Sequence, residues 1–477
     1  MAGWQFWIDR GGTFTDVVAR KPDGGIVTAK LLSEDPARRE DAAVAAIRSL
    51  TGCGAGPLPP ADVRIGTTIA TNALLERKGE SVLLAITCGF GDALTIGTQD
   101  RPDIFARHIV RAAPVHAETL EIDERVDAAG HVLRPLDLAA ARAGLAAAYA
   151  RGLRAVAIVL MHGYRYPAHE RALAELARTI GFSQVSISHE VGALIKLIGR
   201  GDTSVVDAYL SPVLHRYVAG LSVALGGTPL FMQSNGGLVD GRLFRGKDAI
   251  LSGPAGGIVG MAATAAQAGF ERVIGFDMGG TSTDVSLHAG RYERDQEAVV
   301  AGARITAPML RIHTVAAGGG SICRFDGARL LVGPESAGAV PGPACYGRGG
   351  PLTITDCNLL LGKIRPEHFP RLFGPHGDAP LDRAATEAGF AALCAGIAAA
   401  TGRAMTPQAA AEGLVAIAVA DMAKAIRTIS VGRGHDATRF TLVSFGGAGG
   451  QHACLVADAL GIGTVMIHPL AGVLSAY

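Results

Sequence analysis

Short apolar runs alternate with amphipathic stretches along the chain, and this alternation predicts an α/β fold. The apolar runs have the length of strands and lie at 6–8, 13–19, 81–87, 154–161, 184–188, 229–233, 272–276, 283–287, 440–445 and 464–468. Helical spacing occurs between them, at 138–151, 167–180, 406–429 and 452–460, and an Ala/Gly-rich helix begins near 253. Ser33 is predicted to cap a helix that ends before Gly52. Strands that alternate with helices in this way predict a largely parallel sheet.

One decapeptide occurs twice in the chain. Residues 8–17 read IDRGGTFTDV and residues 276–285 read FDMGGTSTDV, and seven of the ten positions are identical. Each copy follows one apolar strand and leads into another. We therefore expect the same strand–turn–strand hairpin once in each half of the molecule.

The residue types in this repeat suggest a phosphate-binding turn. An aspartate at the end of a buried strand is costly unless a cation or a hydrogen bond meets it. Two glycines let backbone N–H groups approach a ligand, and the threonines offer hydroxyl donors to phosphate. Because Mg²⁺ prefers carboxylate, water and phosphate oxygens, two such turns facing each other would hold a Mg²⁺–triphosphate. The alternative is that both are ordinary Gly-Gly hairpin turns that bind no ligand. The presence of two matching copies makes this alternative the weaker interpretation.

A third glycine-rich loop joins the predicted strand 440–445 to the helix near 452. It reads Gly446-Gly447-Ala448-Gly449-Gly450. A bare loop at a helix N-terminus suits a phosphate or the flat face of a nucleoside. The chain contains no G-x-x-x-x-G-K-[ST], and no G-x-G-x-x-G follows the first strand, which argues against P-loop and Rossmann sites.

Composition narrows the class of protein further. A chain of 477 residues predicts two to four domains, and 49% apolar residues supply a large core. With 44 Lys and Arg against 43 Asp and Glu, nothing favours nucleic acid or an anionic membrane. We expect a cytoplasmic protein: the N-terminus lacks a signal-peptide pattern, no apolar run approaches the ~18 residues of a membrane span, and the seven cysteines form no C-x-x-C.

The three glycine-rich turns resemble the phosphate 1, phosphate 2 and adenosine motifs of actin-like ATPases. More narrowly, the chain is similar along essentially all its length to the A-type subunit of the hydantoinase/oxoprolinase family. The resemblance also rests on IGTTIATNALLERKGE (65–80), RPDIF (101–105), RGDTSVVDAYLSP (200–212), LSGPAGGIVG (251–260) and TVAAGGGS (314–321). It implies an actin-like (ribonuclease H-like) α/β fold, with two similar domains around a nucleotide cleft. It further implies an N-terminal family domain at 1–203 and a second, C-terminally truncated domain at 204–477.

The resemblance implies an enzyme that opens a cyclic amide at the expense of ATP. The favoured reaction is that of 5-oxoprolinase, which converts 5-oxo-L-proline, ATP and water into L-glutamate, ADP and phosphate. In it the lactam oxygen is phosphorylated, and such a transfer is catalysed mainly by positioning and charge stabilisation. Asp9 and Asp277 would be catalytic and would hold Mg²⁺, with Asp16 and Asp284 orienting the turns. ATP would be bound by Gly11, Gly12, Thr13, Thr15, Gly279, Gly280, Thr281, Thr283, Gly446, Gly447, Gly449 and Gly450.

The substrate side is less defined by the motifs. Thr67, Thr68, Asn72, Arg101 and Asp103 lie in segments that match the N-terminal half of the family. Arg101 could hold the carboxylate of oxoproline through two hydrogen bonds, although a salt-bridged surface arginine is also consistent with the sequence. Cys345 is expected to be a buried thiol, and lone histidines are usually structural; these are His189, His435 and His452.

The family pattern also implies a partner. Family members continue beyond a region such as LAGVLSAY (470–477), and the B-type half that completes hydrolysis is not in this chain. A B-type subunit and an oligomeric assembly are therefore expected. The alternatives are N-methylhydantoinase A, a subunit of an ATP-dependent ketone carboxylase, another actin-like enzyme such as a sugar kinase, and a non-catalytic nucleotide-binding scaffold. Two carboxylates suited to Mg²⁺ argue against the scaffold.

Overall fold

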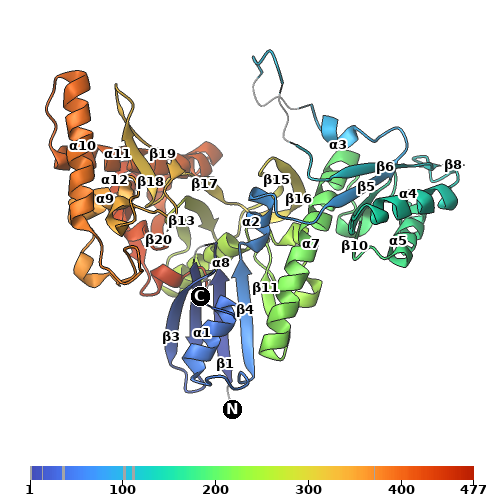
Figure 1. The fold of residues 1–477 in the computed structure, drawn as a ribbon, viewed down its shortest axis with the longest axis horizontal. Coiled ribbons are helices and arrows are strands. Elements are labelled where there is room, and N and C mark those ends of the chain that lie inside the picture. Colours follow the sequence, from blue (N-terminus) through green and yellow to red (C-terminus); the bar gives the residue numbers. More distant parts are fainter. Residues whose placement is uncertain (1–2, 13, 35–37, 100–103, 110–112, 370) are drawn as a thin grey trace. The chain divides into compact units, whose positions relative to one another are not determined.

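The computed structural model describes the whole chain except residues 1–2, 13, 35–37, 100–103, 110–112 and 370. The chain divides into two compact units (Figure 1). Unit 1 comprises Met1–Ala255 and Arg294–Leu310, and unit 2 comprises Gly256–Glu293 and Arg311–Tyr477. The domain limits expected from the sequence, 1–203 and 204–477, stay a prediction.

The first sheet of unit 1 is mixed and has the strand order β12-β11-β4-β1-β2-β3. Strands β1, β2 and β3 are antiparallel neighbours, whereas β4 and β11 run parallel to β1, and β12 is antiparallel to β11. The strands are β1 (Trp4–Arg10), β2 (Phe14–Arg20), β3 (Ile26–Leu32), β4 (Ala61–Thr67), β11 (Leu230–Met232) and β12 (Leu238–Asp240). The helices beside it are α1 (Ala42–Thr51), α2 (Ile69–Leu75) and α7 (Leu197–Leu225).

The second sheet of unit 1 is wholly parallel, with the order β10-β9-β5-β6. Its strands are β5 (Val82–Thr87), β6 (Glu118–Ile122), β9 (Ala155–Val159) and β10 (Gln184–Ile187). Every residue of β5 and β9 is buried, as is usual for parallel strands covered on both faces. The unit also contains α3 (Ala93–Ile96), α4 (Leu138–Ala150), α5 (Ala168–Ile180), α6 (Ser188–Val191) and the hairpins β7 (Arg125–Val126)–β8 (Val132–Arg134) and β15 (Arg294–Val300)–β16 (Ala303–Leu310).

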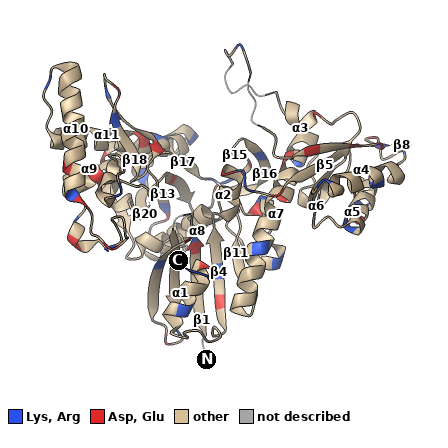
Figure 2. Cartoon of the chain, in the orientation of Figure 1, with Lys and Arg blue, Asp and Glu red and all other residues tan. Residues whose placement is uncertain are grey.

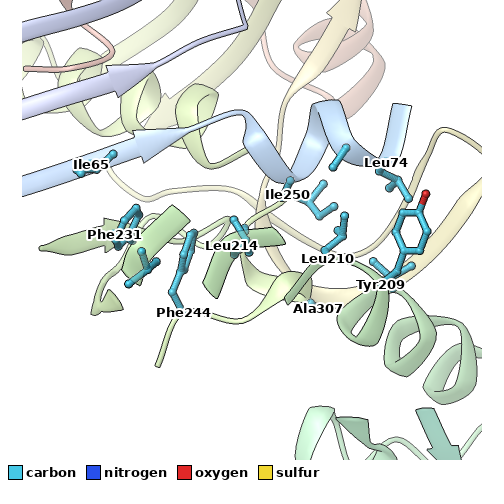
Figure 3. Close-up of a cluster of buried hydrophobic side chains, with 14 of the residues drawn as sticks. Ile65, Leu74, Tyr209, Leu210, Leu214, Phe231, Phe244, Ile250 and Ala307 are labelled. Carbon is cyan, nitrogen blue, oxygen red and sulfur yellow. The ribbon is translucent and has the colours of Figure 1, made fainter. Parts of the chain in front are cut away.

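The main core of unit 1 lies where α7 packs against β4, β11 and α2. Figure 3 shows Leu214 of α7 beside Phe244, and Leu210 farther from the phenylalanines, toward Ile250. The rings of Phe231 and Phe244 stack with centroids 4.9 Å apart. The sequence analysis did not predict α7. Because long stretches of this 29-residue helix are buried on all sides, it lacks the one-sided apolar pattern by which a surface helix is recognised.

Unit 2 is built around a mixed sheet of order β17-β14-β13-β20-β21. Its strands are β13 (Arg272–Met278), β14 (Thr283–Ala289), β17 (His313–Val315), β20 (Thr441–Phe445) and β21 (Val465–Ile467), with a separate hairpin β18 (Ser321–Phe325)–β19 (Leu330–Ser336). The helices are α8 (Ser252–Gln267, which begins in unit 1), α9 (Ile354–Leu360), α10 (Arg383–Thr401), α11 (Pro407–Ile429) and α12 (Ala453–Leu460). Short 3-10 helices lie in unit 1 at Gly241–Leu243 and Gly246–Asp248, and in unit 2 at Ala344–Tyr346, Pro366–His368, Val431–Arg433, Ala437–Arg439, Gly449–Gln451 and Ala471–Val473.

The two mixed sheets share one topology. In each, three successive strands are antiparallel neighbours, and two later strands add in parallel beside the first. The expected α/β fold with two similar domains is confirmed. The largely parallel sheet predicted from the sequence is wrong for both of these sheets, because a short glycine turn can join only antiparallel strands. The predicted cap at Ser33 is also wrong: Asp41 caps α1, whereas its end at Gly52, with φ +68°, is as expected.

Charge and hydropathy single out few regions. Lys and Arg alternate with Asp and Glu on the helices and strands of both units (Figure 2). Within the described part of the chain, α10 alone is long and apolar enough to cross a membrane, judged by length and composition. One such helix is weak support for a membrane span.

Candidate functional site

The first glycine turn joins β1 to β2 and is closed by its own backbone. Asp9 lies opposite Asp16 in the antiparallel register, and Arg10 lies opposite Thr15. The N–H of Gly11 donates to the carbonyl of Phe14 at 3.0 Å. Thr13 lies outside the described residues. The repeat therefore forms the strand–turn–strand hairpin that the sequence predicts.

One carboxylate oxygen of Asp9 is buried and has no hydrogen-bond partner within the described part of the chain. It lies beside Gly66 of the parallel strand β4, and a Cβ on Gly253 would come within 2.9 Å of its Oδ1. This Oδ1 has no hydrogen-bond partner among the described residues. Burial, aided by the nearby charge of Asp16, raises the pKa of Asp9 to about 7, and Lys30 acts in the opposite sense. A buried, uncompensated carboxylate of this kind is suited to a cation.

Side chains hold the first turn in place. Thr15 is buried, and its Oγ1 lies 3.0 Å from the Oγ of Ser33, which donates to the carbonyl of Gly11 at 2.7 Å. Lys30 pairs with Asp16, with 2.6 Å between Nζ and Oδ1. The hydroxyl of Thr15 therefore stabilises the turn from behind.

Three residues expected on the substrate side also lie at this turn. The N–H and Oγ1 of Thr68 both donate to the carbonyl of Arg10, at 3.0 and 3.3 Å. Thr67 lies opposite Arg10 in the β1–β4 register, and its hydroxyl accepts from Ile69 at the start of α2. A Cβ on Gly12 would lie 2.9 Å from Nδ2 of Asn72.

These contacts make Thr67, Thr68 and Asn72 neighbours of the first turn, and their role toward a substrate stays a prediction. Arg101 and Asp103, the other two residues expected there, lie outside the described residues.

The second glycine turn, between β13 and β14, repeats the geometry of the first. Asp277 lies opposite Asp284, and Met278 opposite Thr283. The N–H of Gly279 donates to the carbonyl of Ser282 at 3.0 Å, as in the first turn. Two further residues of this turn, Gly280 and Thr281, are exposed.

Each aspartate of the second turn has hydroxyl neighbours. The Oγ of Ser475 donates to Oδ2 of Asp277 at 3.3 Å, and a Cβ on Gly257 of α8 would lie 3.6 Å from the same oxygen. The Oγ1 of Thr314 donates to Asp284 at 2.5 Å. Burial raises the pKa of Asp284, and this hydrogen bond partly offsets the shift.

A run of three glycines, residues 318–320, lies against the second turn. The N–H groups of Gly319 and Gly320 donate to the carbonyls of Gly279 and Gly280, at 3.1 and 2.6 Å. A Cβ on Gly318 would come within 2.7 Å of the carbonyl oxygen of Gly280. The sequence analysis assigned no role to this run, although three consecutive glycines are a signal for close backbone approach.

The third glycine loop also packs on the second turn. Its first residue, Gly446, has φ +79°, and a Cβ there would overlap Oδ1 of Asp277. The N–H of Ala448 donates to the carbonyl of Met278 at 2.9 Å. Gly447 and Gly450 are exposed, and a Cβ on either would meet nothing within 4 Å. The exposed pair is therefore available to a ligand, whereas Gly446 and the buried Gly449 serve close packing.

Three groups considered as acid–base or nucleophilic candidates are held in structural networks. His452 is buried, with Nε2 2.9 Å from Nδ2 of Asn358, and burial lowers its pKa to about 4. His189 pairs with the buried Glu170 at 2.6 Å. Burial raises the pKa of the Cys345 thiol, so the expected buried thiol is confirmed.

The part of the chain that the structure describes contains no cluster of three His, Cys, Asp or Glu that could hold a metal alone. A hard cation at either turn would therefore take most of its ligands from water or phosphate, as Mg²⁺ commonly does.

The fold and the two turns define a protein of two similar α/β units, each with an Asp-x-Gly-Gly turn at the end of its first strand. Comparison with known sequences is more specific. The profile described as Hydantoinase/oxoprolinase matches residues 200–477, and that of the Hydantoinase/oxoprolinase N-terminal region matches residues 5–181. The chain belongs to the hydantoinase/oxoprolinase family.

Named relatives include eukaryotic and bacterial proteins. The chain is 45% identical to 5-oxoprolinase of Saccharomyces cerevisiae over 516 residues, covering 98% of this chain and 40% of that protein. It is 43% identical to 5-oxoprolinase 1 of Arabidopsis thaliana, covering 99% of this chain and 41% of that protein. The chain thus spans about two fifths of these relatives. It is 35% identical to the caprolactamase subunit alpha of Pseudomonas jessenii, covering 99% of this chain and 69% of that subunit.

Solved structures of the same architecture exist. The ATP-dependent caprolactamase of Pseudomonas jessenii superposes with a TM-score of 0.82 at 34% identity, covering 99% of this chain and 70% of that one. Nucleotide-free acetone carboxylase superposes with a TM-score of 0.80 at 25% identity, covering 99% and 69%. These matches extend over both units of the chain.

Proposed function

We propose that this chain is the ATP-binding part of an ATP-dependent cyclic amide hydrolase, with 5-oxo-L-proline as the favoured substrate. The observation that carries the proposal is the pair of Asp-x-Gly-Gly turns, which share strand register and the closing hydrogen bond of the turn. The choice of substrate is supported by identities of 40–45% to proteins named 5-oxoprolinase.

The reaction needs ATP because a lactam carbonyl is a poor electrophile. Transfer of the γ-phosphoryl group to the lactam oxygen forms one P–O bond, breaks another and releases ADP. Water then adds to the activated carbon, and the ring C–N bond breaks as the nitrogen takes up a proton, which leaves an acyl phosphate. A second water cleaves this acyl phosphate to L-glutamate and phosphate. A protein contributes to such a transfer mostly through positioning and charge stabilisation.

In this proposal each of the two turns binds phosphate of ATP. The exposed Gly280 and Thr281 would bind phosphate oxygens in the second turn, and the exposed Gly12 in the first. Thr13, which lies outside the described residues, keeps its assignment to phosphate from the motif alone. The exposed Gly447 and Gly450 take the adenosine side. Thr15 and Thr283 support the turns and do not bind phosphate directly, because their hydroxyls are hydrogen-bonded within the protein. Thr15 bonds to Ser33, and Thr283 donates to the carbonyl of Ala317.

Asp9 and Asp277 are the proposed Mg²⁺ carboxylates. The fit is best supported at Asp9, whose buried Oδ1 has no partner within the described residues. A bound Mg²⁺ would neutralise phosphate charge. Asp16 and Asp284 lie opposite them on the second strand of each hairpin and keep that turn in register.

We further propose that a B-type subunit or region completes ring opening. Caprolactamase is named by subunits, and this chain covers only two fifths of the 5-oxoprolinases it matches. A partner would supply the groups that bring water to the phosphorylated carbon.

The test is ATP turnover with candidate cyclic substrates. ADP release by the chain together with its B-type partner is measured with 5-oxoproline, hydantoin, caprolactam and acetone. We expect 5-oxoproline to stimulate release the most, with glutamate formed in equal amount. Stimulation by another of the four would replace the substrate assignment, and no ATP turnover with any of them would refute the proposal.

A further inference from the structure

Unit 1 contains a second polar site, lined by residues other than those of the glycine turn. It is a cavity of about 150 Å³ between α3, α7, the segment 113–116 and β16. Its polar lining includes Thr95, Thr98, His116, Asp202 and Arg304, and Leu94, Val205 and Val206 supply an apolar wall. A cavity of this size accommodates a small ring such as benzene.

A carboxylate and a guanidinium line this cavity as a long ion pair between Asp202 and Arg304. Nε of Arg304 lies 3.7 Å from Oδ2 of Asp202, and the two side chains are 25% and 19% exposed. Nη1 of Arg304 also donates to the hydroxyl of Thr98 at 2.8 Å. Burial raises the pKa of Asp202 to about 6 in spite of the arginine. The pair therefore leaves the carboxylate poorly compensated, unlike a close structural salt bridge.

The local sequence places both groups at the cavity wall. Gly201 allows α7 to approach α3 closely, because a Cβ there would lie 2.7 Å from Leu94. The N–H of Thr306 donates to the hydroxyl of Thr203 at 2.8 Å, which fixes β16 beside α7. Gly97, with φ +60°, leaves room for the guanidinium, since a Cβ there would be 3.1 Å from Nη2 of Arg304.

We propose that this cavity binds the α-nitrogen and carboxylate of a small α-amido or α-amino acid, with Arg304 taking the carboxylate and Asp202 accepting the N–H. The proposal rests on the proposed function: 5-oxoproline carries an amide N–H and a carboxylate on the same carbon. A paired cation and anion on one wall match this arrangement, and the apolar wall suits the ring carbons. L-Glutamate shares the same donor and acceptor, so substrate and product are both possible occupants.

Arg304 would then set substrate specificity within the family. A guanidinium recognises a carboxylate by charge-assisted hydrogen bonds. A neutral lactam such as 2-pyrrolidinone lacks the carboxylate, so the guanidinium of Arg304 does not strengthen its binding. The cavity should therefore discriminate between lactams of the same ring size by charge.

The test is calorimetric titration of the full chain, without ATP, with L-5-oxoproline, 2-pyrrolidinone and L-glutamate. We expect the unchanged chain to bind 5-oxoproline well above 2-pyrrolidinone. Arg304→Gln should weaken 5-oxoproline binding by about tenfold or more, and Arg304→Lys by less. Asp202→Asn should weaken L-glutamate more than 5-oxoproline, because an ammonium group needs the charge. Arg242→Gln, at an exposed arginine paired with Asp240, is the matched control and should bind as the unchanged chain does.

The proposal is overturned by absent 5-oxoproline binding, by equal binding of 2-pyrrolidinone, or by unchanged binding in Arg304→Gln. Tighter binding of glutamate than of 5-oxoproline, still dependent on Arg304, assigns the cavity to the product. If Arg304→Gln does not fold, Arg304→Lys carries the comparison. Turnover decides the proposed function separately. If Arg304→Gln opens the ring with an unchanged KM, the cavity proposal is refuted and the proposed function stands. If binding depends on Arg304 but no ring opening occurs, the proposed function is refuted and the cavity proposal stands.

Discussion

The two glycine turns share their strand register and closing hydrogen bond and differ in their surroundings. In each, the aspartates lie opposite one another and a glycine N–H closes the turn at 3.0 Å. The first turn is braced mainly by side chains, those of Ser33, Thr68 and Lys30. The second is braced mainly by the backbone of two glycine-rich loops, 318–320 and 446–449.

This difference shows that the repeated motif specifies the turn and leaves its support free to change. A side-chain brace can be removed one contact at a time, with a modest cost for each hydrogen bond. A backbone brace depends on close approach, so an added methyl group displaces a whole segment. Substitutions should therefore affect the two turns unequally, even at matching positions.

The largest effect is expected at the paired aspartates. Asp9→Asn and Asp277→Asn should each reduce ATP turnover by about two orders of magnitude or more, because each removes a charge proposed to hold the metal–phosphate group. Turnover is followed by ADP release, and circular dichroism checks that the fold persists. Normal turnover in either variant would reject the metal assignment for that turn and break the functional equivalence of the two turns.

The next largest effect concerns the loop that packs on the second turn. Gly446→Ala places a Cβ on Oδ1 of Asp277 at a positive φ. The substitution should lower the free energy of unfolding by about 2 kcal/mol or more and should also impair ATP turnover. Gly447→Ala, whose Cβ meets nothing within 4 Å, is the control and should leave stability within ~0.5 kcal/mol. Denaturant unfolding measures both, and equal losses would show that the loop is not packed as described.

The sequence could predict the turns themselves but not their support. The repeat, the strand before each copy and the hairpin after it are local features, and alternation along a strand fixes which residues lie opposite one another. The bracing contacts are not local: the bond between Thr15 and Ser33 spans 18 positions. Thr67, Thr68 and Asn72 were assigned to the substrate because their segments match the N-terminal half of the family. Nothing in the sequence shows that β4 and α2 also lie beside the first turn.

Two other regions show the limits of pattern reading. Helix α7 is buried on most sides over much of its length, so its apolar residues have no helical stripe to follow. The Asp202–Arg304 pair joins α7 to a hairpin about a hundred residues later in the chain, and no spacing rule connects them. Both features depend on tertiary packing, which a single sequence does not display.

Matching glycines offer a direct test of the comparison. A Cβ on Gly11 would lie 2.9 Å from the carbonyl oxygen of Phe14, whereas one on Gly279 would lie 3.8 Å from that of Ser282. Gly11→Ala should therefore destabilise the chain by about 1–2 kcal/mol, and Gly279→Ala by less than ~0.5 kcal/mol. Denaturant unfolding of the two variants measures the difference. Losses of equal size would mean that the two turns are equivalent in packing as well as in register.

The smallest effect is expected at the second aspartate of each turn, Asp16 or Asp284, and it concerns thermal stability. The pKa of Asp284 is raised from its ordinary value of 3.8 by burial, so folding favours its protonated form. Stability is therefore lost as the pH rises from about 4 through the folded pKa, and the full cost remains at higher pH. Asp284→Asn should raise the melting temperature slightly at about pH 8 and hardly at all at about pH 4.

Asp16→Asn is the matched variant in the first turn. Burial also raises the pKa of Asp16, but the 2.6 Å pair with Lys30 opposes the shift. The substitution removes that ion pair together with the buried charge, so the gain at about pH 8 should be smaller than for Asp284→Asn, or negative. Thermal melting of both variants, without nucleotide, measures the difference. A larger gain for Asp16→Asn would mean that Lys30 does not compensate the first turn, and that side-chain bracing is not what distinguishes it from the second.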